Sequence, residues 1–324
     1  MCTAAVYQTK DHYFGRNLDL EYSYRESVTI TPRNYPLSFR KLPAQKKHYA
    51  LIGMAYVLAG YPLYYDATNE AGLSMAGLHF PGSAVYSPCR AGRDNVASFE
   101  LIPWLLGQCA TVEQARQRLE GVNLTDLAFQ AELPPTPLHW LLADQEQSVT
   151  VEAVRTGLKV YPNPVGLLTN EPPFPFQLAH LSHYMGLSAR PAENRFAPGV
   201  ELIPYSRGMG AIGLPGDLSS ASRFVKAAFG KLNSVSGASE EESVSQFFHI
   251  LGSVEQQRGT VDLGEGKLVT TVYTSCCNMD RGIYYYTTYE NRQITAVELH
   301  KEDLEGIALI SYPLIREQQM FHQN

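Results

Sequence analysis

The second residue of the chain combines two groups that could do chemistry together. Removal of Met1 would leave Cys2 with both a nucleophilic thiol and a free α-amine. A cysteine thiol has an ordinary pKa of about 8.5 and an α-amine one of about 7.7 to 8.0, so at neutral pH part of the amine can accept the thiol proton. We expect methionine aminopeptidase to remove Met1, because Cys2, Thr3 and Ala4 are small. Cys2 is therefore the predicted nucleophile, and the chemistry requires no separate histidine.

Two charged residues are predicted to lie beside Cys2. Apolar residues alternate on both sides of the polar positions 10–12, a pattern typical of a β-hairpin whose first strand starts at Cys2. The returning strand would bring Arg16 to the thiol and Asp19 to the α-amine. A guanidinium stabilises a thiolate, and a carboxylate can hold and orient an amine. The alternative is an ordinary surface pair near a turn.

The remaining cysteines do not indicate a metal site. The chain has 5 cysteines and no CxxC spacing, which argues against a disulfide framework and against zinc. We expect no bound metal and interpret the other cysteines as structural; they are Cys89, Cys109, Cys276 and Cys277.

Composition excludes several classes of protein. Of the 324 residues, 44% are hydrophobic and 18% are charged, and no apolar run is long enough to cross a membrane. A net charge of -6 without a basic run predicts no nucleic-acid binding. Charged residues at positions 10–19 interrupt any secretory signal, so we expect a cytoplasmic location. The spacing of Gly208, Gly210 and Gly213 matches a dinucleotide fingerprint, but no acidic residue follows at the required distance.

The order of predicted elements favours an α+β fold. Alternating and helical periodicities predict strands near residues 28–31, 49–54, 64–67, 138–143, 149–154, 158–161, 166–168, 271–275, 283–288 and 294–299, and helices near 98–108, 111–119, 177–185, 222–232 and 240–252. Thr111 with Gln114 and Ser239 with Glu242 fit capping boxes that open two of these helices, and Gly77 is interpreted as a bend. Strands, paired helices and strands again, without βαβ alternation, indicate a layered antiparallel sandwich rather than a doubly wound parallel sheet. We expect one domain over residues 1–324.

Several different short motifs follow one another along the chain. Cys2-Thr3 is followed by the segment from Phe14 to Asp19 and by Asp66 to Gly77, which reads DATNEAGLSMAG. The others are Leu168-Thr169-Asn170, Leu214-Pro215-Gly216-Asp217, Ser222-Arg223-Phe224, and Tyr284 to Tyr289 with Glu290-Asn291. Over nearly its whole length the sequence resembles the choloylglycine hydrolase family, which comprises bile salt hydrolases and penicillin V acylases.

The resemblance implies a fold and a set of site residues. Family members have the four-layer αββα sandwich of N-terminal nucleophile hydrolases, commonly form homotetramers and use no cofactor. In this chain Cys2 would be the nucleophile, and the other residues that match catalytic positions are Arg16, Asp19, Asn170 and Arg223. The amide of Asn170 would suit an oxyanion hole, because a donor held in place before the reaction can stabilise the tetrahedral oxygen.

One position departs from the family pattern. His79 stands where bile salt hydrolases generally have asparagine and penicillin V acylases often have tyrosine. If the backbone N–H of His79 completes the oxyanion hole, as in relatives, its side chain can vary without loss of the hole. The imidazole would then either contact the substrate or pack at the pocket rim.

The resemblance also implies an activity and its alternatives. We expect a bile salt hydrolase, in which Cys2 cleaves the amide of glycine- or taurine-conjugated bile acids through a thioester and the preference between the two amines stays open. Apolar loops would hold the sterol body; they comprise Leu18, Tyr22, Phe80 and the segments 58–61 and 128–133. An acylase for penicillin V or acyl-homoserine lactones is the alternative enzyme, and a sterol-binding protein without turnover is the alternative outside enzymes.

Overall fold

The chain folds around two antiparallel sheets that lie face to face. The computed structural model describes residues 1–324. One sheet has six strands in the order β12 (Leu167–Leu168), β1 (Cys2–Gln8), β2 (His12–Leu20), β13 (Thr270–Asn278), β14 (Ile283–Thr288) and β15 (Thr295–Glu298). The other has eight, in the order β11 (Gly157–Pro162), β10 (Ser148–Val154), β9 (Leu138–Ala143), β6 (Ser74–His79), β5 (Tyr61–Asn69), β4 (Leu51–Leu58), β3 (Ser27–Thr31) and β16 (Ile310–Pro313).

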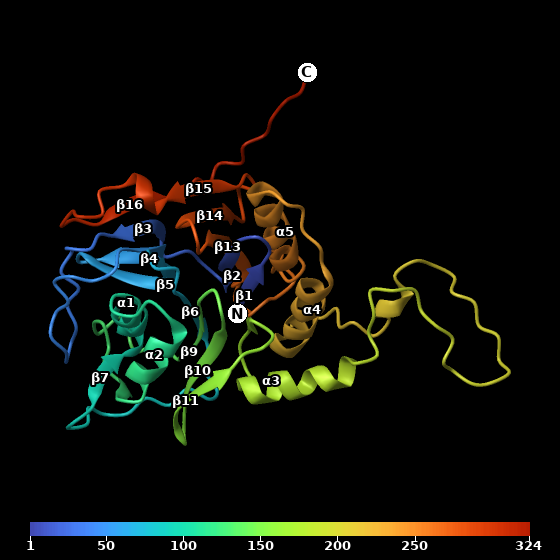
Figure 1. Ribbon diagram of the computed structural model, residues 1–324, viewed down its shortest axis with the longest axis horizontal. Coiled ribbons are helices and arrows are strands. Elements are labelled where there is room, and N and C mark those ends of the chain that lie inside the picture. Colours follow the sequence, from blue (N-terminus) through green and yellow to red (C-terminus); the bar gives the residue numbers. More distant parts are fainter.

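Helices cover the outer face of each sheet (Figure 1). On the six-stranded sheet, α4 (Ser220–Asn233) and α5 (Glu240–Gly252) bury Phe224 and Phe247 in a core shared with residues of both sheets. On the eight-stranded sheet, α1 (Leu101–Leu106) and α2 (Val112–Leu119) pack with Trp140 in a second core. A short parallel pair, β7 (Asp94–Ala97) and β8 (Val122–Thr125), flanks these helices. The layers therefore run α, β, β, α, and the predicted α+β sandwich is confirmed.

Successive side chains of β1 and β2 point to opposite faces of the sheet, and this alternation decides which layer each residue faces. Cys2 pairs with Leu18, and Ala4 pairs with Arg16, so these side chains point toward the eight-stranded sheet. Asn17 points the other way, where its amide donates to the Leu251 carbonyl on α5. Asp19 shares the helix-facing side with Asn17, because the two positions differ by two residues. Arg16 and Asp19 therefore approach the start of β1 from opposite faces of one sheet.

Several helix ends were predicted correctly and others were not. The capping box of Ser239 and Glu242 opens α5 as expected. Thr111 caps α2 by accepting from the Gln114 N–H, but the Gln114 side chain bonds to Ala110 instead of returning to Thr111. The capping box predicted for α2 is therefore only half formed.

The helix predicted over 177–185 begins earlier than expected. Its α-helical part is α3 (Phe174–His180), followed by a 3-10 turn at Leu181–Tyr184. Prolines lie at the start of α3, where the first helical turn tolerates them because its N–H groups have no helical partner. The helix predicted over 98–108 is likewise split into a 3-10 turn at Ser98–Glu100 and α1.

Four of the strands were missed, and all four are short. β6, β7, β8 and β16 have only four to six residues each. Gly77 was interpreted as a bend, but it lies inside β6, where a Cβ would come within 3.1 Å of the Trp140 indole nitrogen. The absence of a side chain at Gly77 therefore permits close packing between β6 and β9.

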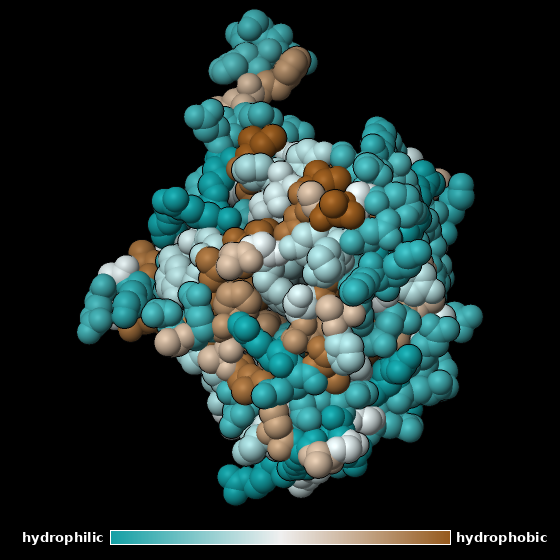
Figure 2. Space-filling model, turned by 90° about the vertical axis from the view of Figure 1, so that its left-hand side faces the viewer, coloured by the Kyte–Doolittle hydropathy of each residue, from teal (hydrophilic) through white to brown (hydrophobic).

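A long connection between α3 and α4 leaves the body of the protein. Residues 186–216, which we call the arm, contain one 3-10 turn at Met209–Ala211 and extend away from the sandwich (Figure 1). A backbone bond from Ser188 to Gly210 closes the base of the arm. The face of the molecule turned away from the arm is mostly hydrophilic, with hydrophobic side chains in patches along its middle (Figure 2). None of the helices has the length and apolar character needed to cross a membrane.

Candidate active site

Five residues from four separate segments meet at the start of β1. Cys2 begins β1, Arg16 and Asp19 lie on β2, Asn170 follows β12, and Arg223 lies on α4. Each of these residues is at most 7% exposed. All five predicted catalytic residues therefore belong to one buried cluster, which the antiparallel register of β12, β1 and β2 and the docking of α4 bring together.

Arg16 lies directly against the thiol. Its Nη2 donates to Cys2 Sγ at 2.6 Å, and its Nη1 donates to the carbonyls of Tyr65 and Gly77 on the opposite sheet. Burial alone would lower the pKa of Arg16, but the neighbouring Cys2, Tyr273 and Asp66 together raise it above its ordinary value. The guanidinium therefore stays charged and stabilises negative charge on sulfur.

Asp19 carries an unused acceptor close to the same strand end. Its Oδ1 accepts from the Thr271 hydroxyl at 2.7 Å, whereas its buried Oδ2 has no hydrogen-bond partner and lies 4.0 Å from Arg223 Nη1. Burial raises the pKa of Asp19, against the lowering influence of Arg223 and the chain's amino terminus. The Met1 amine donates to the Asp19 backbone carbonyl at 2.6 Å rather than to its carboxylate. The predicted pairing of the Asp19 carboxylate with the amine of Cys2 stays a prediction.

Arg223 holds the backbone of the first residues. Its Nη1 donates to the Cys2 carbonyl at 2.7 Å and to the Thr3 hydroxyl at 2.6 Å, and its Nη2 donates to Asn170 Oδ1 at 2.7 Å. Burial lowers the pKa of Arg223, while Asp19 and Cys2 raise it. Arg223 therefore fixes Cys2 and Asn170 relative to one another.

The amide of Asn170 has a defined orientation. Its Oδ1 accepts from the Cys2 N–H at 2.8 Å, and its Nδ2 donates to the His79 carbonyl at 2.8 Å. An amide nitrogen carries two hydrogens, so one N–H of Nδ2 is left for a further acceptor.

The backbone of His79 faces the same space. The Phe80 N–H donates to the Pro137 carbonyl. Hydrogen-bonded and non-hydrogen-bonded pairs alternate along an antiparallel ladder, so the neighbouring pair of His79 and Leu138 has no hydrogen bonds between its two backbones. The N–H and carbonyl of His79 therefore point away from β9, on the side where Asn170 lies. His79 lies at the surface, and partial desolvation of its imidazole by neighbouring atoms and the positive amino terminus lower its pKa. Asn170 Nδ2 and the His79 N–H can therefore both donate to one substrate oxygen.

The predicted substrate-binding residues differ in accessibility. Tyr22 is 52% exposed, and its ring lies 4.9 Å from that of Tyr24. Leu18 and Phe80 are buried, at 3% and 0% exposed, so the structure does not place them on an open surface. Phe80 is turned inward because its ring stacks on His139 at 4.2 Å. The assignment of Leu18 and Phe80 to the substrate site stays a prediction.

Two of the predicted substrate loops do meet. The Tyr61 ring, at the end of the β4–β5 turn, lies 5.7 Å from the ring of Phe129. Phe99 packs against both rings, and the Arg40 guanidinium lies over Phe129. Segments 58–61 and 128–133 are therefore held together by one aromatic cluster.

Several contributing residues were not singled out from the sequence. Asp66 is buried and accepts hydrogen bonds from Tyr273 at 2.6 Å and Tyr284 at 2.7 Å, and burial raises its pKa. These bonds cross from β5 to β13 and β14, so they tie the two sheets together behind Arg16. Asp66 opens the longest sequence motif, but only the fold shows what its carboxylate contacts. Thr271 was missed because a single threonine in a strand carries no signal, and Thr3 belongs to the first motif without any indication that it contacts Arg223.

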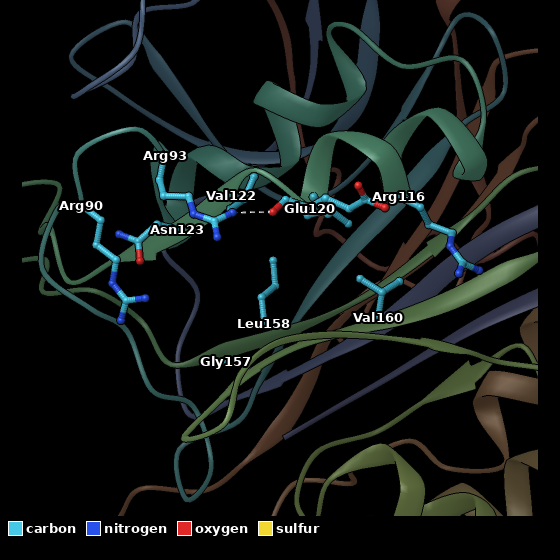
Figure 3. Close-up of a pocket in the computed structure, with 10 residues that line it drawn as sticks. Arg90, Arg93, Arg116, Glu120, Val122, Asn123, Gly157, Leu158 and Val160 are labelled. Atoms are coloured by element: carbon cyan, nitrogen blue, oxygen red, sulfur yellow. Dashed lines mark hydrogen bonds between the residues drawn. The ribbon is translucent and has the colours of Figure 1, made fainter.

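A separate cavity of about 360 Å³ lies at the outer edge of the eight-stranded sheet (Figure 3). Leu158 and Val160 of β11 form one wall, and Arg90, Arg93 and Arg116 surround the opening. None of the five clustered residues lines it. All five cysteines are unpaired, and no group of three or more His, Cys, Asp or Glu side chains could hold a metal ion.

Comparison with known proteins agrees with this fold and cluster. The family model for linear amide C–N hydrolases, choloylglycine hydrolase family, matches residues 2–312. The chain is 54% identical to the bile salt hydrolase/transferase of Lactiplantibacillus plantarum and 36% identical to that of Clostridium perfringens, over 100% of each chain. A crystal structure of a mutant conjugated bile acid hydrolase from Clostridium perfringens superposes with a TM-score of 0.92 at 36% identity and full coverage of both chains.

A more distant structure shares the fold. Penicillin V acylase from Agrobacterium tumefaciens superposes with a TM-score of 0.76 at 21% identity, over 96% of this chain and 91% of that one. The sandwich and the family match define a hydrolase of linear amide C–N bonds. The chain belongs to the choloylglycine hydrolase family.

Proposed function

We propose that this protein is a bile salt hydrolase that cleaves the amide between a bile acid and glycine or taurine. The observation that carries the proposal is the contact of Arg16 Nη2 with Cys2 Sγ at 2.6 Å, which places a permanent positive charge on a thiol at the start of β1. The relatives named bile salt hydrolase/transferase, similar over the whole chain, support the choice of substrate.

The reaction begins once Met1 has been removed. The α-amine of Cys2 takes the thiol proton, and the sulfur attacks the carbonyl carbon of the amide. The developing oxyanion accepts from Asn170 Nδ2 and from the His79 backbone N–H, both of which lie on the free side of β6. Asp19 Oδ2 provides an acceptor for the ammonium group that forms.

Collapse of the tetrahedral intermediate breaks the C–N bond. The leaving amine takes the proton from the α-ammonium group and departs as glycine or taurine, which leaves the acyl group on sulfur as a thioester. Water then gives a proton to the α-amine and attacks the thioester carbon. Release of the thiol completes the cycle and yields the free bile acid. Arg16 and Arg223 keep Cys2 in place throughout, and we propose that no cofactor takes part.

The exposed Tyr22 and several half-buried aromatic residues supply an apolar surface for the acyl group. Tyr22 and Tyr24 form one such surface, with the Tyr56 ring 5.9 Å from Tyr24. The cluster of Tyr61, Phe99 and Phe129 joins the loops that the sequence assigned to the sterol body. Such surfaces suit a rigid apolar body.

The test is amine release from glycocholate, taurocholate and penicillin V, measured by mass spectrometry on protein whose first residue is confirmed as Cys2. We expect cleavage of the bile salts and its loss in Cys2→Ala, while circular dichroism of the variant stays unchanged. Cleavage of penicillin V alone would make the acylase the function. Bile acid binding without turnover would support the sterol-binding alternative, and activity in Cys2→Ala would exclude the mechanism.

Transfer to amines is a second candidate activity. Several relatives carry the name bile salt hydrolase/transferase. A thioester on Cys2 can be attacked by an amine as well as by water, which would form a new amide. Adding a second amino acid to the glycocholate reaction and searching for its bile acid amide tests this activity; absence of the amide at high amine concentration would limit the enzyme to hydrolysis.

We also propose that the protein forms a homotetramer. The arm projects several apolar side chains that are mostly exposed, among them Phe196 at 80%, Ile203 at 78% and Tyr205 at 85%. An apolar segment with no core of its own is typical of an interface between subunits. The number of four subunits comes from the family resemblance.

A further inference from the structure

A buried pair of ionisable residues lies behind the oxyanion donors. His139 on β9 and Glu152 on β10 are directly paired in the sheet, and both side chains are 0% exposed. His139 Nδ1 lies 3.1 Å from Glu152 Oε1. Burying two ionisable groups without solvent is costly, so their retention calls for a specific role.

The pair holds the segment that carries Asn170 at two points. His139 Nε2 lies 2.9 Å from the Thr169 carbonyl, one residue before Asn170. Glu152 Oε1 accepts from the Phe174 N–H at 2.8 Å, four residues after Asn170. The two bonds therefore bracket the turn from which the Asn170 amide projects.

The same imidazole contacts the other side of the site. Its ring stacks on Phe80 at 4.2 Å with an interplanar angle of 7°. Phe80 follows His79, whose carbonyl accepts from Asn170 Nδ2. One histidine thus fixes both the strand that presents the His79 N–H and the turn that presents the Asn170 amide.

The hydrogen-bond partners dictate where the protons lie. The Thr169 carbonyl can only accept, so His139 Nε2 must carry a hydrogen, and the Phe174 N–H can only donate, so Glu152 Oε1 must accept. The contact between Nδ1 and Oε1 then needs one proton, held by the imidazole or by the carboxyl group. Glutamine at position 152 could not complete this series of hydrogen bonds with a neutral histidine. Its oxygen could accept from the Phe174 N–H but could not donate to His139 Nδ1.

We propose that His139 and Glu152 are positioning residues that hold the two oxyanion donors, Asn170 Nδ2 and the His79 N–H, at a fixed separation. This inference rests on the proposed function. Both side chains are fully buried, and neither forms a hydrogen bond with Cys2. Their effect is to keep a pre-formed donor pair in place, and small displacements of catalytic donors cost up to about 10²-fold in rate.

Three variants test the pair. In His139→Leu we expect kcat for glycocholate to fall about 10²-fold with KM changed less than about threefold, because the donors act on the transition state. His139→Gln keeps a donor for the Thr169 carbonyl and should recover about tenfold of that loss. Glu152→Gln should have a kcat between those of wild type and His139→Leu, since only the hydrogen bond between position 152 and His139 Nδ1 is missing.

A matched control separates positioning from stability. His48 is also a buried histidine, and its two nitrogens lie 2.7 Å from the carbonyls of Tyr49 and Tyr35. His48→Leu should lower the melting temperature without lowering kcat below about half of the wild-type value. Alkylation of Cys2 by iodoacetamide should proceed at the same rate in wild type and His139→Leu, because Arg16 is untouched.

A crystal structure of His139→Leu gives a readout that does not depend on the substrate. We expect the bond between Asn170 Nδ2 and the His79 carbonyl to be lost or lengthened. If wild type cleaves no bile salt but this bond is lost, the proposed function fails and the positioning role stands. An unmoved Asn170, a kcat within threefold of wild type, or a parallel loss in His48→Leu would overturn the inference.

Discussion

At the scale of single residues, Arg16 does more than supply charge. Its planar fork reaches the Cys2 sulfur with one nitrogen and two carbonyls of the opposite sheet with the other. A lysine has the same charge, but it is a point donor on a flexible stem and cannot reproduce this geometry. The position of the guanidinium over sulfur therefore depends on its two anchoring carbonyls.

Arg16→Lys should accordingly impair the nucleophile more than the fold. We expect alkylation of Cys2 by iodoacetamide at pH 7 to slow about tenfold and kcat/KM to fall about 10²-fold, because less of the thiol is held as thiolate. Thermal unfolding is the control, with a shift of only a few degrees expected. An alkylation rate equal to that of wild type would show that Arg16 does not activate the thiol.

The sequence predicted the residues of the cluster better than their roles. A cysteine at position 2 and the hairpin that follows it pointed to Arg16 and Asp19, because strand pairing is local. Asn170 and Arg223 were assigned through the family resemblance, since nothing in their local spacing brings them to Cys2. The inward turn of Phe80 onto His139 was not predicted, because an apolar side chain at a strand end gives no indication of which way it turns.

At the scale of elements, the start of α4 determines where Arg223 lies. Ser219 caps the helix, and Asp217 accepts from the Ser219 N–H at 3.0 Å and the Ser222 hydroxyl at 2.5 Å. These hydrogen bonds lower the pKa of Asp217 from 3.8 to about 2. A carboxylate near a helix N-terminus also interacts favourably with the helix dipole.

Asp217→Ala should therefore weaken the first turn of α4. We expect a loss of about 1 kcal/mol or less in the free energy of unfolding at pH 7, because the carboxylate is exposed and screened. The folded-state pKa lies below the ordinary value, so this stabilisation is present above pH 3.8 and is lost as the pH falls toward about 2. Urea unfolding of both proteins from pH 7 down to pH 3 measures it; a difference that grows as the pH falls would contradict the assignment.

The predicted element boundaries were wrong where the local sequence is compatible with more than one structure. The capping box of α5 has the expected reciprocal bonds, and its bounds match the prediction. The start of α3 was missed because prolines open as well as end helices, and β6 was missed because Gly77 lies in its middle. In both cases tertiary packing decides the outcome, which a local pattern does not contain.

At the scale of the whole molecule, the site depends on both sheets and on a helix layer. Cys2 and Arg16 belong to one sheet, the carbonyls of Tyr65 and Gly77 to the other, and Arg223 to α4. Asp66 joins the sheets through Tyr273 and Tyr284. We propose that residues 1–324 form one domain for this reason, because the site is incomplete without any of these layers.

The arm is the one long segment that the sandwich does not explain. Its exposed Phe196, Ile203 and Tyr205 contribute nothing to either core, so serine at all three positions should leave the melting temperature of an isolated subunit nearly unchanged. If the arm forms the subunit interface, wild type should have the mass of four chains by light scattering and the triple variant a smaller one. Replacing the exposed Val235 on the α4–α5 connection by serine is the matched control and should not alter the mass. A wild-type mass of one chain would exclude the tetramer, and a triple variant that remains tetrameric would place the interface outside the arm.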